Sequence, residues 1–467
     1  MSWQTGIGIA LSVLDGVAIL HAVLRGRAVE ATLAWVFAIL AFPGVGAVAY
    51  LALSSPSIKR TTRRKRRATS TLRGTLAERV ATVAEVPEGS VLQLATALTG
   101  LGPTAGNRVR LMAGDERALD EIEAAVRAAQ RSIWAEYYII RRDATGRRFL
   151  ALLAEKAAAG VEVRLLYDAV GSLRIDGRLL AAITAAGGHA QEFLPLNPLR
   201  RRWALQLRNH RKIIIVDGAL GFTGGMNIGD EHSGSGRRRG ALQFRDTHLA
   251  LHGPAVGDLA QIFAEDWTFA TGEPLEPLPP PEPVNGSVVA IVPSGPDQEH
   301  NANGLVFFTG ITQARRRVYL ASPYFIPDEA TLRALIGAAL RGVDVRVLLP
   351  ETCDVALVGP ASRFYEPVLV CAGVRIFRYR IGTLHAKTLV VDGEWGVVGS
   401  ANLDVRSFRL NFELGALVVD PNFAHRLEAR FLEDLAGSRE VTAAALARVG
   451  VVRRLLYGAA RLLSPLL

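Results

Sequence analysis

The chain has 467 residues, more than one ordinary hydrophobic core accommodates, so two or three domains are expected. Its 54 basic and 44 acidic residues give a net charge of +10, which favours anionic partners such as membrane surfaces, phosphorylated substrates or nucleic acid. The two cysteines, Cys353 and Cys371, lack metal-ligand spacing and do not indicate a disulfide framework, so a reducing compartment is expected.

The N-terminal region contains two apolar stretches, residues 5–24 and 31–53, each long enough to span a bilayer. Asp15 and His21 lie in the first stretch and are costly in lipid unless they have partners. A second apolar stretch follows and no basic region precedes the first, which argues against a cleaved signal peptide. A buried helical hairpin is the alternative. We predict a transmembrane helical hairpin over residues 1–55.

A basic run, "KRTTRRKRR" at 59–67, follows the second apolar stretch. It is far more basic than the loop between the two stretches. The positive-inside rule therefore predicts that residue 59 onward lies in the cytoplasm and that both ends of the hairpin lie on that side of the membrane. The run could also bind anionic headgroups. Residues 56–107 are therefore expected to be a basic linker at the membrane surface.

The remainder of the chain begins with a helical pattern at 115–130, followed by a short apolar strand at 132–140. Residues 146–168 then read as a helix, a stop at Gly160 and a buried strand. Alternating helices and strands of this kind are typical of an α/β fold. We expect residues 108–271 to form a first α/β half.

The same order returns in a second copy, with a strand at 316–326 and a helix followed by a strand within 329–350. The segments "AAAGVEVRLLYD" and "ALRGVDVRVLLP" correspond between the copies. A proline-rich stretch at 272–286 can continue neither a helix nor a central strand and is expected to be the connector. Residues 287–467 are therefore predicted to form a second, similar half, with 450–467 as a basic amphipathic segment that lies on a membrane or packs on the core.

Each half contains one histidine-x-lysine motif that is followed by Asp-Gly. The motif residues are His210, Lys212 and Asp217 in the first half, and His385, Lys387 and Asp392 in the second half. In a strand, histidine and lysine point to one face, while the aspartate falls on the other face at a hairpin turn. We predict that histidine and lysine do the chemistry and that the aspartate, although grouped with this catalytic set, mainly fixes the turn. Two halves related by a pseudo-two-fold axis would bring both motifs into one composite site.

Small and polar residues return beside each motif on the following strands. Candidate phosphate-binding residues are Gly225 and Asn227 in the first half, and Ser400 and Asn402 in the second half. Each histidine also needs a group that sets its tautomer. Asp246 and Glu413 occupy matching places on the strand after each motif and are the candidates for this role.

Two histidines and two lysines around one pocket suit phosphodiester chemistry. One neutral imidazole can attack phosphorus to form a phosphohistidine, and the other, when protonated, can donate to the departing alkoxide. The lysines and asparagines would neutralise the non-bridging oxygens. The residues leave open which histidine attacks. The scheme requires no metal and no cofactor, and none is expected.

The two HxKxxxxD motifs, with "GGMN" and "GSAN", resemble the phospholipase D superfamily, whose two halves share one active site. Finer features, including "GGMNIGDEH", "FRDTHLALHGPAV", "VPSGPD" and "SPYFIPD", are similar to bacterial cardiolipin synthases. The resemblance implies transfer of a phosphatidyl group from one phosphatidylglycerol to another, with release of glycerol. It makes His210 the nucleophile and His385 the general acid and base, with Lys212, Lys387 and the two asparagines on the phosphate.

The resemblance also implies a multi-pass protein of the bacterial inner membrane, with its catalytic halves on the cytoplasmic side and phosphatidylglycerol and anionic lipids as partners. The alternatives are a hydrolase of the same chemistry, a membrane-tethered nuclease and an inactive lipid-binding scaffold. Two intact motifs argue against the scaffold. The membrane hairpin argues against the nuclease, so no nucleic acid is expected as a partner. The oligomeric state is left open.

Overall fold

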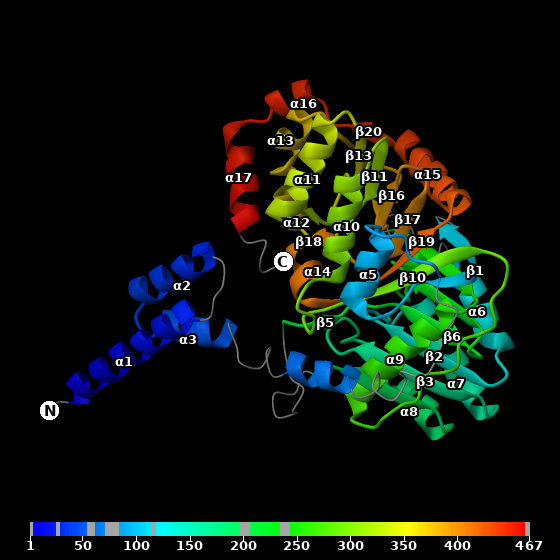
Figure 1. The fold of residues 1–467 in the computed structure, drawn as a ribbon. Coiled ribbons are helices and arrows are strands. Elements are labelled where there is room, and N and C mark those ends of the chain that lie inside the picture. The colour runs from blue at the N-terminus through cyan, green and yellow to red at the C-terminus, as the bar shows by residue number, and fades with distance from the viewer. Residues whose placement is uncertain are drawn as a thin grey trace. The chain divides into compact units, whose positions relative to one another are not determined.

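The structure is a computed structural model that describes residues 3–24, 29–53, 61–70, 84–113, 118–195, 206–233 and 243–462. The chain divides into two compact units, unit 1 with residues 1–63 and unit 2 with residues 64–467. Unit 1 contains the N-terminal apolar helices. Unit 2 contains both repeated halves (Figure 1).

Unit 1 consists of α1 (Trp3–Leu24), α2 (Val29–Ala41) and α3 (Val45–Leu53), which pack on one another. Within the described residues, the helix long and apolar enough to cross a membrane is at Thr5–Leu24, with a mean hydropathy of 2.1. The second predicted span, 31–53, is divided between α2 and α3. With 13 and 9 residues, neither helix alone reaches across about 30 Å of hydrocarbon.

The break between α2 and α3 occurs at Pro43 and Gly44, where Gly44 has a φ of +76°. The N–H of Gly44 donates to the carboxylate of Asp15, with distances of 2.9 and 3.2 Å to the two oxygens. His21 Nδ1 lies 2.7 Å from the hydroxyl of Tyr50. The two polar residues of the first apolar stretch therefore have partners within unit 1, as residues in a lipid environment require.

The first half of unit 2 contains the alternating helices and strands that its sequence pattern predicts. Its elements are β1 (Thr104–Ala113), α6 (Ala118–Ala128), β2 (Ser132–Tyr137), α7 (Ala144–Ala158), β3 (Glu162–Asp168), α8 (Gly177–Ala185), β4 (His189–Phe193), β5 (Arg208–Asn209), β6 (Ile213–Val216), β7 (Leu220–Gly224), η1 (Asp230–His232), β8 (Phe244–Arg245), β9 (Thr247–His252) and α9 (Ala255–Thr271). The helix stop predicted at Gly160 is confirmed, because this residue follows α7 with a φ of +84°.

The second half repeats this order and adds helices at its C-terminal end. Its elements are β10 (Ser287–Ser294), α10 (Ala302–Gln313), β11 (Arg317–Ala321), β12 (Phe325–Ile326), α11 (Glu329–Leu340), β13 (Asp344–Pro350), α12 (Val358–Arg363), α13 (Glu366–Cys371), β14 (Arg375–Tyr379), β15 (Thr383–Leu384), β16 (Thr388–Val391), β17 (Trp395–Gly399), β18 (Leu403–Asp404), α14 (Val405–Arg409), β19 (Asn411–Val419), α15 (Pro421–Ala436), β20 (Ser438–Glu440), α16 (Ala443–Ala447) and α17 (Val451–Leu462).

One continuous sheet of 16 strands passes through both halves. The first half has the order β4-β3-β2-β6-β7-β9-β1, and the second half has the matching order β14-β13-β11-β16-β17-β19-β10. β1 and β10 pair antiparallel where the halves meet. In Figure 1 the second half, in yellow to orange, lies above the first half, in cyan to green. This mirrored order confirms the predicted duplication of one α/β unit.

Each half has its own hydrophobic core. The second core also contains residues from before the first half: α5 (Val91–Thr99) packs against α10 and β10, and Val91, Leu92 and Ala95 are buried there. Part of the segment that the sequence assigned to a linker, 56–107, is therefore folded against the second half. β1 likewise begins at residue 104, before the expected start of the first half at 108.

Candidate active site

The two motif aspartates fix turns, in agreement with their predicted role. The carboxylate of Asp217 accepts the backbone N–H groups of Gln130, Arg131 and Ser132 at 2.7–3.2 Å. Asp392 accepts the N–H groups of Arg315, Arg316 and Arg317 at the start of β11 in the same way, at 2.7–2.9 Å. Both aspartates have a φ of +54°. Their carboxylates therefore join the turn after each motif to the start of a neighbouring central strand.

The first motif begins before its strand. His210 and Lys212 precede β6 (Ile213–Val216), whereas the sequence predicted a strand from residue 210. The residues just before this strand pair with the other half, because β5 runs parallel to the start of β19. The N–H of His210 also donates to the carbonyl of Phe412 at 2.8 Å.

The second motif shows the reciprocal arrangement. β15, directly before His385, pairs parallel with β8 of the first half, and the N–H of His385 donates to the carbonyl of Arg245 at 2.8 Å. Arg245 precedes Asp246 in the chain, just as Phe412 precedes Glu413. Each motif is thus hydrogen bonded to the segment that presents the carboxylate of the other half.

The histidine–carboxylate pairs consequently cross between the halves. His210 Nδ1 lies 2.8 Å from Glu413 Oε2, and His385 Nδ1 lies 2.6 Å from Asp246 Oδ2. All four side chains are buried. Each half therefore supplies the histidine of one pair and the carboxylate of the other, and the two motifs form one composite site.

Burial and charge set the protonation of this site. Burial lowers the pKa of His210 to about 4 against the opposing charge of Glu413, and burial with Lys387 lowers the pKa of His385. Burial by itself would raise the pKa of Glu413 and Asp246, but the neighbouring cations and hydrogen bonds outweigh it and keep both carboxyl pKa values below their usual range. Without a bound anion, these shifts favour ionised carboxylates and neutral imidazoles near neutral pH. An Nδ1–H that donates to a carboxylate leaves the Nε2 lone pair available.

The two motif lysines are fully buried beside the histidines. Lys212 Nζ donates to the carbonyl of His210 at 2.6 Å, and Lys387 Nζ contacts the carbonyl of His385 and lies 2.8 Å from its Nδ1. Burial lowers the pKa of Lys212 to about 7 and also lowers the pKa of Lys387. Because an anion would offset this desolvation, the pair is suited to hold a phosphate group.

The two candidate asparagines occupy equivalent buried positions. The backbone N–H of Asn227 donates to His232 Nε2 at 3.4 Å, and that of Asn402 donates to Ser407 Oγ at 3.2 Å. Both acceptors lie five residues after the asparagine. Among the described residues, Oδ1 of each asparagine has no hydrogen-bond partner. A hydrogen bond therefore fixes the backbone at each asparagine, while the side-chain amide oxygen remains available to a ligand.

Gly225 and Ser400 lie against the two carboxylates that contact the histidines, Asp246 and Glu413. A Cβ on Gly225 would lie 2.1 Å from Asp246 Oδ1, so glycine makes room for that side chain. Ser400 Oγ donates to Glu413 Oε2 at 2.5 Å and accepts the N–H of Leu414 at 2.9 Å. The hydroxyl that we expected on the phosphate therefore holds a histidine-orienting carboxylate.

Three rings that the motif analysis did not single out surround the histidines. Tyr138 meets the ring of His210 edge-on, with ring centroids 4.7 Å apart, and Phe244 stacks on His385 at 4.7 Å with an interplanar angle of 7°. His232 lies edge-on to His385 at 5.5 Å. The available signals were the position of Phe244 two residues before Asp246 and the histidine at the end of "GGMNIGDEH".

His232, Asp246 and His385 present ligand atoms within 4.8 Å of one another, a spacing that a metal ion could bridge. Asp246 and His385 already share a hydrogen bond, and the ammonium of Lys387 lies 2.8 Å from His385 Nδ1. A second cation at this point would be repelled by the lysine. The donor set thus fits proton transfer better than metal binding.

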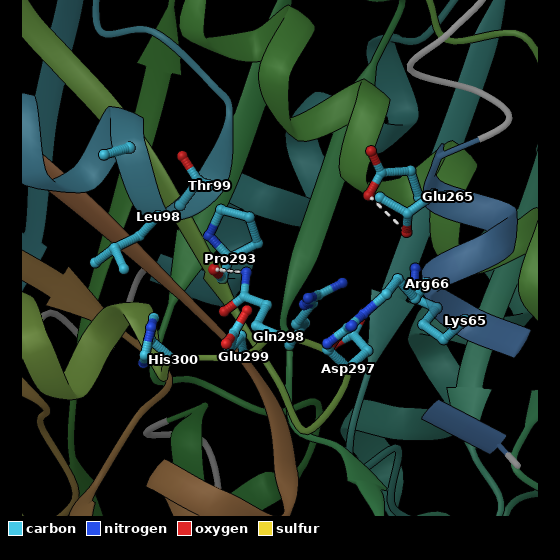
Figure 2. A pocket seen from close by; sticks show the side chains of 13 residues that line it. Lys65, Arg66, Leu98, Thr99, Glu265, Pro293, Asp297, Gln298, Glu299 and His300 are labelled. Carbon is cyan, nitrogen blue, oxygen red and sulfur yellow. Dashed lines mark hydrogen bonds between the residues drawn. The ribbon is translucent and has the colours of Figure 1, made fainter. Parts of the chain in front are cut away.

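A further group of charged residues surrounds Arg211, which lies between His210 and Lys212 of the first motif. Arg211 contacts Asp266 and donates from Nε to the carbonyl of Glu413 at 3.1 Å. Asp266 Oδ1 also lies 2.6 Å from Lys65 Nζ, and Lys65 is only 1% exposed. Figure 2 shows Lys65 beside a cavity of about 400 Å³ that Arg211 also lines. At least one residue of the basic run therefore binds the protein itself, through a contact with a sequence separation of 201 residues.

Comparison with known families agrees with this geometry. The family model described as "Cardiolipin synthase, PLD-like domain" matches residues 122–267 and 307–435, one segment in each half. The model described as "Phospholipase_D-nuclease N-terminal" matches residues 13–54. One model therefore matches a segment in each half, and a second model matches the N-terminal helices.

Similar proteins cover nearly the whole chain. Cardiolipin synthase A of Pseudomonas aeruginosa (strain LESB58) is 38% identical over 469 residues, covering 98% of this chain and 95% of that protein. Cardiolipin synthase A of Pseudomonas entomophila (strain L48) is 38% identical over 467 residues, covering 98% and 97%. Among solved structures, the phosphatidylserine synthase of Haemophilus influenzae Rd KW20 matches with a TM-score of 0.62 at 14% identity, covering 81% of this chain and 100% of that chain, and shows the same fold. The chain therefore belongs to the cardiolipin synthase family of the phospholipase D superfamily and is a membrane-associated enzyme.

Proposed function

We propose that this protein is a phosphatidyltransferase that converts two phosphatidylglycerol molecules into cardiolipin and glycerol through a phosphohistidine intermediate. The crossed pairs, His210 with Glu413 and His385 with Asp246, carry the proposal. They supply two imidazoles, each oriented by a carboxylate, in one buried site that also holds two lysines. A phosphodiester requires this combination of a nucleophile, a proton donor and charge neutralisation.

In the first step, Nε2 of His210 attacks the phosphorus of phosphatidylglycerol. A P–N bond forms while the P–O bond to the glycerol headgroup breaks. The imidazolium of His385 gives its proton to the departing glycerol oxygen, and glycerol leaves. Glu413 stabilises the positive charge that develops on His210, since its carboxylate accepts the Nδ1–H.

In the second step, His385 takes a proton from the headgroup hydroxyl of another phosphatidylglycerol. That oxygen attacks phosphorus, the P–N bond breaks, and His210 is released as a neutral imidazole. The product is cardiolipin, and His385 is again protonated for the next cycle. Lys212, Lys387, Asn227 and Asn402 are the proposed contacts for the non-bridging oxygens throughout.

The proposed acid must carry a proton when substrate is bound, although burial lowers the pKa of His385 in the free enzyme. The phosphodiester brings a negative charge into the same buried site, and an opposite charge nearby favours the charged form of an imidazole. Asp246, at 2.6 Å, favours it further. Binding of substrate and protonation of His385 are therefore coupled in this scheme.

We also propose that the N-terminal helices cross the bacterial inner membrane as a hairpin, with α2 and α3 together forming a bent second span and unit 2 in the cytoplasm. The basic run after α3 supports this orientation. Cys371 is exposed on unit 2 and provides a test. A membrane-impermeant maleimide should label it in inverted vesicles and leave it unlabelled in intact spheroplasts. The opposite pattern would reverse the orientation.

The decisive experiment for the reaction uses membranes that contain the full-length protein and phosphatidylglycerol, with lipids identified by mass spectrometry. Cardiolipin together with an equal amount of free glycerol is expected. Phosphatidic acid without cardiolipin would instead assign a hydrolase, in which water takes the second step. A variant lacking both motif histidines gives the background.

A further inference from the structure

The C-terminal helix α17 packs with its apolar face outward. Its large apolar side chains lie on one stripe and are 51–81% exposed; they are Val451, Val452, Leu455, Leu456 and Leu462. A surface helix of a globular protein normally turns such a stripe toward the core. Here the stripe is the side that the described protein leaves uncovered.

The opposite side of α17 makes the contacts with unit 2. The helix packs against α12, and Ala460 is 2% exposed. Arg461 places its guanidinium over the rings of Phe364 and Tyr365, at 4.6 and 5.9 Å from the ring centroids. A basic residue and a small residue thus face the protein while leucine and valine face away, so burial in unit 2 does not explain the apolar stripe.

We propose that the outward stripe of α17 inserts into the interface of a bilayer that contains anionic lipid. Arg453 and Arg454 flank the stripe, while Arg461 faces the protein, and the helix has no acidic residue. Apolar side chains at the level of the acyl chains, flanked by arginines at the headgroups, are the composition that binds anionic interfaces.

A second copy of this chain fits the same face poorly. A two-fold interface brings identical patches together, so each arginine of one helix would approach the arginines of the other. No acidic residue of α17 could offset this repulsion. Lipid phosphates would be attracted by the same arginines. The positive charge of α17 thus favours binding to anionic lipid over association with a second copy of the chain.

Exposed apolar side chains also lie on the segment between the active site and α12, on which α17 packs. Asp354 is close enough to act on the charges of both His385 and Lys387. Val355 and Leu357, the next large side chains, are 37% and 39% exposed and lead directly into α12, on which α17 packs. Docking of α17 would therefore hold this segment near the layer that contains the substrate headgroups, in addition to the N-terminal anchor.

The test uses the full-length protein in vesicles of phosphatidylglycerol and phosphatidylethanolamine. Cys371→Ser removes the exposed thiol, and burial raises the pKa of the remaining Cys353 to about 12, so that thiol stays unreactive. An environment-sensitive dye is then attached at Leu455→Cys. The matched control is Leu340→Cys at the end of α11, since Leu340 is 72% exposed and Leu455 is 68% exposed.

We expect the dye at position 455 to shift its emission to shorter wavelength and to be quenched by lipids brominated on their acyl chains, while the dye at position 340 does neither. Equal, water-like emission at both positions would overturn the proposal. So would a shift at position 455 without quenching, together with disulfide-linked dimers of the unlabelled Leu455→Cys protein, because a second copy would then cover the stripe. This readout is independent of activity and so of the proposed reaction.

A functional test separates docking from catalysis. Leu455→Asp with Leu456→Asp should lower turnover of vesicle phosphatidylglycerol about tenfold, because two apolar contacts with lipid are lost. Turnover of a short-chain, monomeric phosphatidylglycerol should remain within twofold of the parent protein. Equal loss on both substrates would assign α17 a structural role and contradict docking.

Discussion

The two halves orient their histidine partners by different means. In the first half Asp246 carries a short carboxylate that approaches the backbone of Gly225 so closely that no side chain fits there. In the second half Glu413 is longer, and Ser400 fills the equivalent place and donates a hydrogen bond to it. The two halves thus contain the same strands, but the residue beside each carboxylate differs. Glycine accompanies the shorter aspartate, and serine accompanies the longer glutamate.

A second difference lies five residues after each of the two candidate asparagines, Asn227 and Asn402. The first half has His232, whose Nδ1 lies 3.8 Å from Asp246, and the second half has Ser407. Because the carboxylates cross between the halves, Glu413 and Ser400 lie beside His210. Asp246 and His232 lie beside His385. The proposed nucleophile and acid thus lie in chemically distinct surroundings, as two different roles require.

The largest expected effect tests the roles of the two histidines. His210→Ala and His385→Ala should each lower cardiolipin formation by about 10³-fold or more, since a nucleophile or a general acid is lost. With labelled phosphatidylglycerol, only His385→Ala should accumulate an acid-labile phosphoenzyme. Accumulation in His210→Ala would exchange the two roles, and full activity in both variants would end the shared-site scheme.

Neutral amides in place of the carboxylates test the crossing itself. Glu413→Gln and Asp246→Asn should each lower kcat about 10²-fold, because each removes the charge that stabilises an imidazolium. Single-turnover kinetics should show slow phosphoenzyme formation for Glu413→Gln. Asp246→Asn should also slow this step, because it weakens the proton donor His385, so the pairing is read from NMR titration of the imidazoles: Glu413→Gln should lower the pKa of His210, and Asp246→Asn that of His385. The exchanged pattern would show that the carboxylates act within their own halves.

Exchange of the small residues tests how each carboxylate is held. Gly225→Ser should lower kcat at least tenfold, because its Cβ would displace Asp246. Ser400→Gly should cost about tenfold through loss of one charge-assisted hydrogen bond to Glu413. Steady-state kinetics in vesicles measures both. Wild-type kinetics in Gly225→Ser would show that the two positions tolerate the same residue after all.

The lysines should produce an alkaline limb in the pH profile. With a pKa of about 7, free-enzyme Lys212 loses its charge as the pH rises. We expect kcat/KM to halve near pH 7 and to be about tenfold lower one unit above it. The limb should be weaker in kcat, because bound phosphate favours the charged lysine. Lys212→Arg, with lower activity overall, should remove the contribution of Lys212 and leave only the loss caused by deprotonation of His385, whose pKa is also lowered. An unchanged profile would assign the decline near pH 7 to another group.

The smallest effect concerns His232, which accepts the N–H of Asn227. His232→Ser supplies the acceptor used in the second half and should reduce kcat only about threefold, whereas His232→Ala leaves that N–H unsatisfied and should cost about tenfold. Equal losses in both variants would show that the imidazole acts on the Asp246–His385 pair rather than on the backbone.

Local pattern was sufficient for much of the fold. The strand after Gly160, the repeat and the turn aspartates were predicted because apolar periodicity and Asp-Gly turns act over a few residues. The break in the second apolar stretch was not predicted, because the span was judged only from the number of consecutive apolar residues. Pro43 and Gly44 signalled it, since proline disfavours helix and Gly44 takes a positive φ.

The sequence by itself determined which residues could do the chemistry: two histidines, two lysines and a carboxylate after each motif, repeated in matching places. Only the tertiary structure decided which carboxylate serves which histidine, because the pairing of β5 with β19 and of β15 with β8 joins segments that are far apart in the chain. It likewise decided that α17 turns its apolar stripe outward. Periodicity shows that a helix has two faces, but the surrounding surfaces select the face that is buried.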